Sequence, residues 1–484
     1  MKSSMKIFLP VIFILLLNYS CSTQNEKMPL TTNSEEALKE YIEGRNLAEN
    51  LRGLEALAYF KNAIELDENF AMAYVGFAFN NPTAKGFFEN LNKAVSLIDK
   101  VSEGERTYIL GVDAGVNGHL HLQQTYFEQL VNMYPGDERA HNFLGNNYFA
   151  QQLFPEAIAQ FQKAIKINPD YAAPYNSLGY AYRPLGKFDK AEEAFKNYID
   201  LIPDDPNPYD SYAELMLKMG EFDKSIMHYE KALEKDNNFV ASYLGIAANL
   251  NYKGEYDGAR NKLNELLTSA RNDGERRTAL NNIAISYVDE GKLDKAIDYI
   301  KQQYELAEKF NDKAAMSNDL ALLGNVYYEM GELEKAFDHY KMSVEMADAA
   351  EMSNERKENI RLLHFYNTGS IAMKKGSIDE AKNKCDEFIA GVKEINNPNQ
   401  MRLARQLSGL ILMKEGNYEE AARELKRANM QNPYNLFILA KVYKEMDSTD
   451  LAKKFLSKAA NFYSLPNLQY AFVRNKANQM LSEL

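Results

Sequence analysis

Residues 138–171 of the chain, ERAHNFLGNNYFAQQLFPEAIAQFQKAIKINPDY, decide the fold that the sequence predicts. Two segments of this stretch each place apolar or small residues on one helical face, at spacings of three and four: Leu144, Gly145, Tyr148, Ala157, Phe161 and Ala164. Gly145 and Ala157 have almost no side chain where the two helices would face each other, so their backbones can approach closely. Pro169 would end the second helix, because proline cannot continue the helical hydrogen bonds. The stretch therefore predicts a hairpin of two packed helices.

This hairpin resembles the tetratricopeptide repeat (TPR), a helix–turn–helix unit of about 34 residues. The residues that match the family consensus are Leu144, Gly145, Tyr148, Ala157, Phe161, Ala164 and Pro169. His141 replaces the aromatic residue that the family has near the start of the unit. The resemblance implies an all-α fold, a right-handed α-solenoid in which each hairpin buries its apolar face against the next one.

The same pattern recurs along residues 37–466, where all of twelve units have Gly or Ala at the position of Gly145. Residues 71–103 depart most from the pattern. By the spacing of the units, the folded part divides into an array mainly of 34-residue units, an array of longer units and a C-terminal capping helix, over residues 35–276, 277–466 and 467–484.

The amino-terminal residues 1–20 have the features of a signal peptide. Lys2 and Lys6 give the segment a positive start. Residues 7–17 form an apolar run of 11 residues, which is too short to cross a bilayer. The pattern therefore favours a leader for export over a membrane-spanning helix.

Cys21 follows Ser20 in a sequence that resembles the lipobox of bacterial lipoproteins, with Asn18 where that family usually has Leu. The resemblance implies that Cys21 carries a lipid and that the exported chain is anchored in the bacterial cell envelope. A secreted protein without a lipid is the alternative. Residues 21–34 are polar and without periodicity, and they predict a flexible tether between the lipid and the folded array.

The net charge of the chain limits the classes of molecule that it could bind. The chain of 484 residues has 56 Lys and Arg against 68 Asp and Glu, a net charge of −12. Phosphate contacts need a basic surface, so this balance argues against a nucleic-acid partner. With only Cys21 and Cys385 present, a structural disulfide in the folded part is not expected.

The concave face of the solenoid is the candidate binding site, because the first helices of TPR units line a groove that holds proteins or peptides. We place the groove on the residues of three first helices that face away from the small packing residues: Asn142, Asn146, Phe149, Asn176, Tyr180, Arg183, Asp210 and Glu214. Asn side chains both donate and accept, so Asn142, Asn146 and Asn176 could clamp a peptide backbone. The alternative is that they are solvated polar surface.

The carboxylate clamp of chaperone-binding TPR proteins is not expected here. It requires Lys and Arg, and this chain has Asn142, Ser177 and Asn207 at those positions. A chaperone C-terminal peptide is therefore not a favoured ligand.

Sequence motifs for catalysis or metal binding are missing. His119 and His121 lack a nearby set of further ligands, and Cys385 stands at a core position of its repeat, where it should be buried and inert. We predict no cofactor, no metal and no enzyme. The expected function is a membrane-tethered scaffold that binds proteins or peptides. The alternatives are a ligand-responsive regulator, an accessory factor in envelope assembly or secretion, or an enzyme hidden in residues 71–137.

Overall fold

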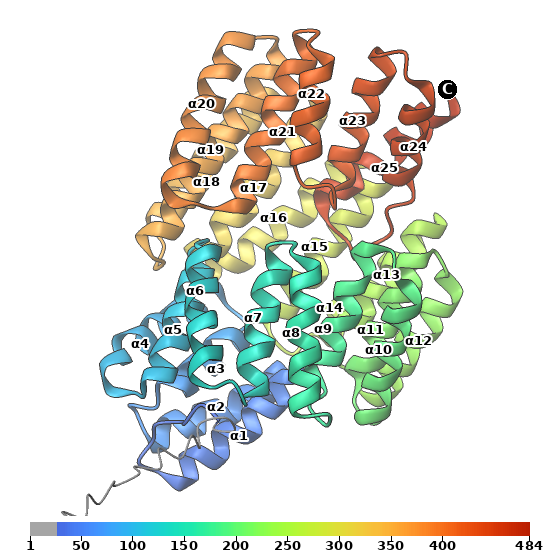
Figure 1. Ribbon diagram of the computed structural model, residues 1–484. Helices are drawn as coiled ribbons and strands as arrows, with labels where there is room; N and C mark the ends of the chain where they lie inside the picture. Colours follow the sequence, from blue (N-terminus) through green and yellow to red (C-terminus); the bar gives the residue numbers. More distant parts are fainter. Residues whose placement is uncertain (1–26) are drawn as a thin grey trace, which may run out of the picture.

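The computed structural model describes residues 27–484, so the predicted signal peptide and Cys21 lie outside the described residues. Within that range the regular structure is entirely helical, which confirms the predicted all-α fold. Helices α1 to α24 pair into twelve antiparallel hairpins, and α25 follows the last of them (Figure 1).

The helices of the first seven hairpins are α1 (Glu35–Glu49), α2 (Gly53–Leu66), α3 (Ala71–Asn80), α4 (Ala84–Ser96), α5 (Glu103–Val116), α6 (Leu120–Met133), α7 (Glu138–Ala150), α8 (Phe154–Ile167), α9 (Ala173–Tyr182), α10 (Phe188–Leu201), α11 (Pro206–Met219), α12 (Phe222–Lys235), α13 (Val240–Lys253) and α14 (Tyr256–Ser269). Two short 3-10 helices, η2 (Ile98–Lys100) and η3 (Arg183–Leu185), lie between them.

The remaining helices are α15 (Asp273–Glu290), α16 (Leu293–Lys309), α17 (Lys313–Met330), α18 (Leu333–Asp348), α19 (Asn354–Lys375), α20 (Ile378–Ile395), α21 (Pro398–Lys414), α22 (Tyr418–Arg427), α23 (Pro433–Glu445), α24 (Thr449–Ala460) and α25 (Leu468–Ser482). The longer repeat spacing predicted for this part corresponds to longer helices: α17 has 18 residues and α19 has 22, whereas α7 has 13.

Gly145 shows why each hairpin needs a small residue. A Cβ atom on Gly145 would lie 2.5 Å from the ring of Phe161, which is fully buried between α7 and α8. The predicted close approach at Gly145 is therefore confirmed, and the group that fills it is the ring of Phe161. Gly179 lies against Phe195 and Gly324 against Tyr340 in the same way, at 2.5 Å in both cases.

The second half of the chain lies on the first half, as the yellow-to-red and blue-to-green helices of Figure 1 show. The contacts join the turns within the early hairpins to turns and helix ends of the later ones. Asn359 of α19 donates to the backbone oxygen of Asn117 (2.8 Å), and Arg402 of α21 donates to that of Gln151 (2.5 Å). We call this set of contacts the seam. The solenoid thus winds back onto itself, which the repeat pattern did not predict.

The irregular segment 71–103 forms α3 and α4, and its departure from the repeat pattern coincides with the seam. The carboxylate of Asp312, the N-cap of α17, accepts from the backbone N–H of Ala315 (3.0 Å). The same carboxylate also accepts from the first N–H of α4, at Ala84 (3.0 Å). Nearby, Gly274 lies so close to Pro82 that a Cβ would be 2.6 Å from the Pro82 carbonyl oxygen. The short turn before α4 therefore fits a neighbour that is far away in sequence.

Residues 27–34 correct one prediction. The sequence predicts a flexible tether up to residue 34, but residues 27–34 bind along the edge of the first hairpins. The reason is that their polar groups meet carboxylates at the inter-repeat turns, and Met28 and Leu30 pack on the first core cluster.

The last helix, α25, packs against α24 and α23, and in addition reaches α15 and α17. Its Leu468 and Phe472 belong to the core around α15 and α16. The C-terminal helix therefore also joins the end of the array to its middle.

Candidate functional site

The second half of the array encloses a cavity of about 970 Å³. Its walls come from the first helices of three successive hairpins (α15, α17 and α19), from one face of their partner helices α16 and α18, from α4 across the seam, and from the residues that lead into α25. We call it the superhelix cavity. Its volume is at the upper end of the range of ligand sites, about 300–1,000 Å³.

Three side-chain amides that line the superhelix cavity are free to bind a ligand. Asn281 of α15, Asn318 of α17 and Asn367 of α19 line it, and none has a hydrogen-bond partner among residues 27–484. A fourth amide, Asn325, accepts from the Tyr340 hydroxyl (2.9 Å) and is thereby fixed. Each free amide can both donate and accept, which suits the alternating N–H and C=O groups of an extended backbone.

Apolar side chains form the rest of the wall. Phe87 and Phe88 of α4 line the cavity and meet edge to face, with ring centroids 5.0 Å apart, and Phe79 packs behind them, 5.3 Å from Phe87. Phe310 lines the cavity and is 49% exposed. Such surfaces favour a ligand that brings apolar side chains as well as a polar backbone.

The charged groups at the superhelix cavity are mostly paired. Arg277 of α15 binds both carboxylate oxygens of Asp319 (2.7 and 3.0 Å), where burial raises the pKa of Asp319 to about 6 against the opposing effect of the arginine. Arg356 lines the cavity, and its guanidinium has no partner among the described residues. It is the charge that the surrounding structure leaves for a ligand.

His364 also lines the superhelix cavity, and its Nδ1 atom is buried without a hydrogen bond. Burial lowers the pKa of His364, and the charge of Lys384 acts in the same direction. The imidazole is therefore neutral near pH 7 and adds one more polar atom without a partner in the described part of the chain.

The repeat pattern relates this cavity to the groove predicted in the first half. Asn142 and Asn146 lie three residues before and one residue after Gly145. The equivalent positions around Gly324 are Ala321 and Asn325, and both line the superhelix cavity. The predicted face of the first helices is thus the face that lines a cavity, but it does so in the second half of the chain.

In the first half several predicted groove residues are engaged within the array. Asn142 is 6% exposed and donates to the hydroxyl of Tyr171 (3.4 Å). Asn146 is exposed and accepts from Ser177 (3.3 Å). Asn142 therefore cannot belong to the clamp predicted for Asn142, Asn146 and Asn176, because packing between repeats buries it. Asn176 is half-buried.

The other predicted residues form a network of their own, apart from Phe149, which packs edge to face on Phe154. Glu214 accepts from the Tyr180 hydroxyl (2.8 Å) and forms an ion pair with Arg183 (2.8 Å), whose guanidinium lies 4.9 Å from the Tyr180 ring. The structure thus brings Tyr180, Arg183 and Glu214 together in one network, in which Glu214 binds the other two side chains.

Asp210 lies beside this network and is buried. Its carboxylate accepts from the Ser242 hydroxyl of the next repeat (2.7 Å). The prediction that Asp210 lines the groove is therefore wrong, because the next repeat covers it. Burial raises the pKa of Asp210 to about 7, and the charge of Glu214 adds to the shift.

In residues 27–484 no three His, Cys, Asp or Glu side chains are grouped as a metal site would require. None of the helices in that range is long and apolar enough to cross a membrane. Cys385 is buried as predicted, and burial raises the pKa of its thiol. His119 bonds across the seam to the backbone oxygen of Ile395 (3.0 Å).

Comparisons by sequence identify the repeats. Three family models for the tetratricopeptide repeat match residues 275–349, 145–183 and 172–205. No curated protein sequence matches the chain. The matched segments are tetratricopeptide repeats, as predicted from residues 138–171, and the all-helical hairpins around them agree with the predicted α-solenoid fold. TPR proteins generally mediate protein–protein interactions.

Solved structures with similar hairpins include a TPR protein of Thermus thermophilus, which is 21% identical with a TM-score of 0.30, the match covering 44% of this chain and 98% of that one. A TPR protein of Parabacteroides merdae is 18% identical with a TM-score of 0.36, and its match covers 54% of this chain and 98% of that one.

Proposed function

We propose that the chain is an exported scaffold, lipid-anchored through Cys21 in the bacterial cell envelope, that binds an extended segment of a partner protein in the superhelix cavity. The observation that carries the proposal is the row of three unpartnered amides, Asn281, Asn318 and Asn367, beside the apolar wall of α4. Nothing in this proposal requires a catalytic group.

The binding part is tested by photo-crosslinking in cells. A photoreactive residue at Asn318 faces the superhelix cavity, and one at Met342, which is 42% exposed on the neighbouring helix α18, is the matched control. We expect a discrete crosslinked protein from position 318 and none from position 342. The same product from both positions, or none from position 318, would overturn the proposal.

Binding chemistry is tested by a second variant. Replacing both Asn318 and Asn367 by Ala should remove the crosslink formed from a probe at position 281, because the two free amides that remain beside the probe are then lost. These side chains have no internal partner in the described residues, so helix content by circular dichroism should stay unchanged. Loss of the crosslink together with loss of helix content would point to a structural role instead.

The anchor is tested separately. The lipid should appear as an increased mass of the amino-terminal peptide, and Cys21→Ala should release the protein from the membrane fraction. A Cys21→Ala protein that stays in the membrane fraction contradicts the anchor without affecting the binding site.

A regulatory role is the second candidate, and one observation favours it. The superhelix cavity takes its walls from both sides of the seam, since α4 belongs to the first half and α15, α17 and α19 to the second. A bound segment would contact both halves and stabilise the closed seam. Small-angle scattering with and without the captured partner segment should then differ, and identical profiles would remove this candidate.

A further inference from the structure

The residues that precede the first hairpin, Lys27–Ser34, form an extended segment that we call the strap. It crosses three consecutive inter-repeat turns, and at each turn a carboxylate accepts from it. Asp137 accepts from the backbone N–H of Met28 (2.8 Å), Glu105 from that of Thr31 (2.8 Å), and Asp67 from the Thr32 hydroxyl (2.6 Å). The strap therefore passes from Asp137 to Glu105 within three residues and reaches Asp67 with the next residue, so five residues of extended chain contact three repeats.

Apolar contacts and close packing also hold the strap. Met28 and Leu30 pack against the core cluster of the first two hairpins. Gly104, at the start of α5, lies so close to Met28 that a Cβ would be 2.8 Å from the Met28 Cγ atom. The array thus has a shaped surface for the strap.

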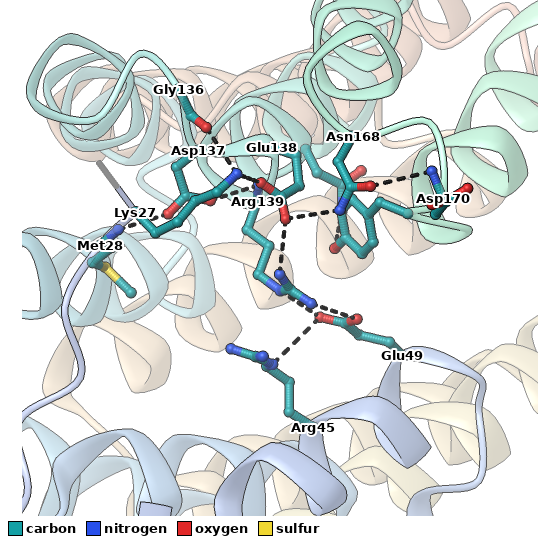
Figure 2. Close-up of polar contacts among 12 residues, drawn as sticks. Lys27, Met28, Arg45, Glu49, Gly136, Asp137, Glu138, Arg139, Asn168 and Asp170 are labelled. Atoms are coloured by element: carbon teal, nitrogen blue, oxygen red, sulfur yellow. Dashed lines mark hydrogen bonds and ion pairs between the residues drawn. The ribbon is translucent and has the colours of Figure 1, made fainter. Parts of the chain in front are cut away.

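The amino-terminal end of the strap, at Lys27, is held by charged groups, as Figure 2 shows. Lys27 donates to the backbone oxygen of Gly136 (2.9 Å) and pairs with the buried carboxylate of Glu138. Glu138 also binds Arg139 (3.1 Å), which reaches Glu49 at the end of α1 (3.1 Å). Lys27 is therefore tied to the turn between α6 and α7 and, through it, to the first hairpin.

The docked strap limits how far the array can lie from Cys21. Six residue steps separate Cys21 from Lys27, so their Cα atoms are at most about 20 Å apart. A tether that stayed free up to Ser34 would extend to about 45 Å. Docking of the strap thus more than halves the reach and fixes the point at which the tether leaves the array.

We infer that the strap holds the edge of the array at the α6–α7 turn against the lipid surface, so that the scaffold has a set orientation on the membrane. The inference rests on the proposed lipid at Cys21. It commits to a bilayer surface as the partner of this edge, and it leaves the hairpins from α11 onward farther from the lipid.

The test uses the full chain, purified with its lipid and reconstituted in phospholipid vesicles that contain headgroup spin-labelled lipid. A fluorophore is placed at Asn132, exposed near the end of α6, or at Met227, which is 44% exposed on α12. We expect several-fold stronger quenching at position 132 than at position 227. Equal quenching at the two positions would overturn the inference.

A strap variant separates docking from mere proximity. Lys27→Glu with Thr31→Ala repels Glu138 and removes a hydroxyl contact to Glu105, and both changes lie outside the hairpins. Quenching at position 132 should fall toward the value at position 227, while helix content stays the same. Unchanged quenching in this variant would also overturn the inference.

The failure of the anchor can be told from the failure of the strap. Mass spectrometry of the purified chain reports the lipid on Cys21 directly, and its absence overturns both the anchor and this orientation. Hydrogen exchange of the Met28 and Thr31 amides reports strap docking in the same sample. Fast exchange there with the lipid present overturns the inference alone.

Discussion

Asp210 is the residue whose environment has the clearest consequence for stability. It is buried near Glu214, Tyr229 and the Ser242 hydroxyl, and burial raises its pKa to about 7. In the unfolded chain a carboxyl of this kind has a pKa of about 4. The folded state therefore holds a proton that the unfolded state releases, so this contribution to stability is lost as the pH rises from about 4 through 7.

Asp210→Asn should remove this loss, because the amide stays neutral and can still accept from Ser242. We expect the variant to be more stable than the parent by roughly 1–3 kcal/mol at pH 8, with a smaller difference at pH 5. Urea denaturation at the two pH values measures it. The control is the exposed Asp204, which forms a solvated ion pair with Lys235 (3.2 Å), and Asp204→Asn should change both curves far less than Asp210→Asn does. Lower stability of Asp210→Asn at pH 8 would contradict the assignment.

Single positions also show what the sequence could and could not predict about the site. The face that lines the superhelix cavity follows from helical spacing, and Asn325 lies at the position predicted from Asn146. Whether that face is open depends on what packs across it, and the spacing carries no information about this. Asn142 is covered by Tyr171 and Asp210 by the next repeat, whereas Asn318 meets no partner in the described residues. Asn318 and Asn367 also lie at other positions relative to Gly324 and Gly369 than Asn142 and Asn146 do relative to Gly145, so the packing around them had to be known to single them out.

Helix α4 is the element whose position depends most on a distant residue. Asp312 caps α17 and binds the start of α4 with the same carboxylate. Asp312→Ala should therefore cost more than a simple N-cap, which contributes about 1 kcal/mol. We expect faster hydrogen exchange at the start of α17 and also at residues 84–86, although the two segments are far apart in sequence.

The control for this prediction is Asn432→Ala. Asn432 caps α23 through the N–H of Tyr434 (2.9 Å), and within residues 27–484 its side chain forms no hydrogen bond across the seam. Its replacement should speed up hydrogen exchange at the start of α23 alone. If Asp312→Ala likewise affects only its own helix, α4 does not depend on Asp312 and the double role is refuted.

The sequence predicted most of the elements because each hairpin repeats one local rule. A small residue faces an aromatic ring, as Gly145 faces Phe161, and spacing alone reveals that rule. The positions of the strap and of the irregular α3–α4 hairpin do not follow from this rule, for a physical reason. Their positions are set by single carboxylates such as Glu105 and Asp312, which belong to hairpins elsewhere in the chain. No periodicity marks such contacts.

For the molecule as a whole, the seam decides whether the solenoid is closed or open. Neighbouring hairpins share apolar cores, whereas the seam is formed at turns and helix ends by hydrogen bonds, which individually contribute about 1 kcal/mol, and by isolated ring contacts such as that of Phe222 with Tyr463. The seam should therefore open before any hairpin unfolds. This order is expected because repeat stability comes from contacts between adjacent units.

Arg402→Ala combined with Asn359→Ala removes the side-chain bonds to Gln151 and Asn117 and should open the seam. The radius of gyration measured by X-ray scattering should increase, while helix content by circular dichroism remains that of the parent. Arg423→Ala, which removes only an exposed pair with Glu420, is the matched control and should leave the radius unchanged. A double variant as compact as the parent would show that the other contacts across the seam, such as Asp312 with the start of α4 and Phe222 with Tyr463, suffice to hold the two halves together.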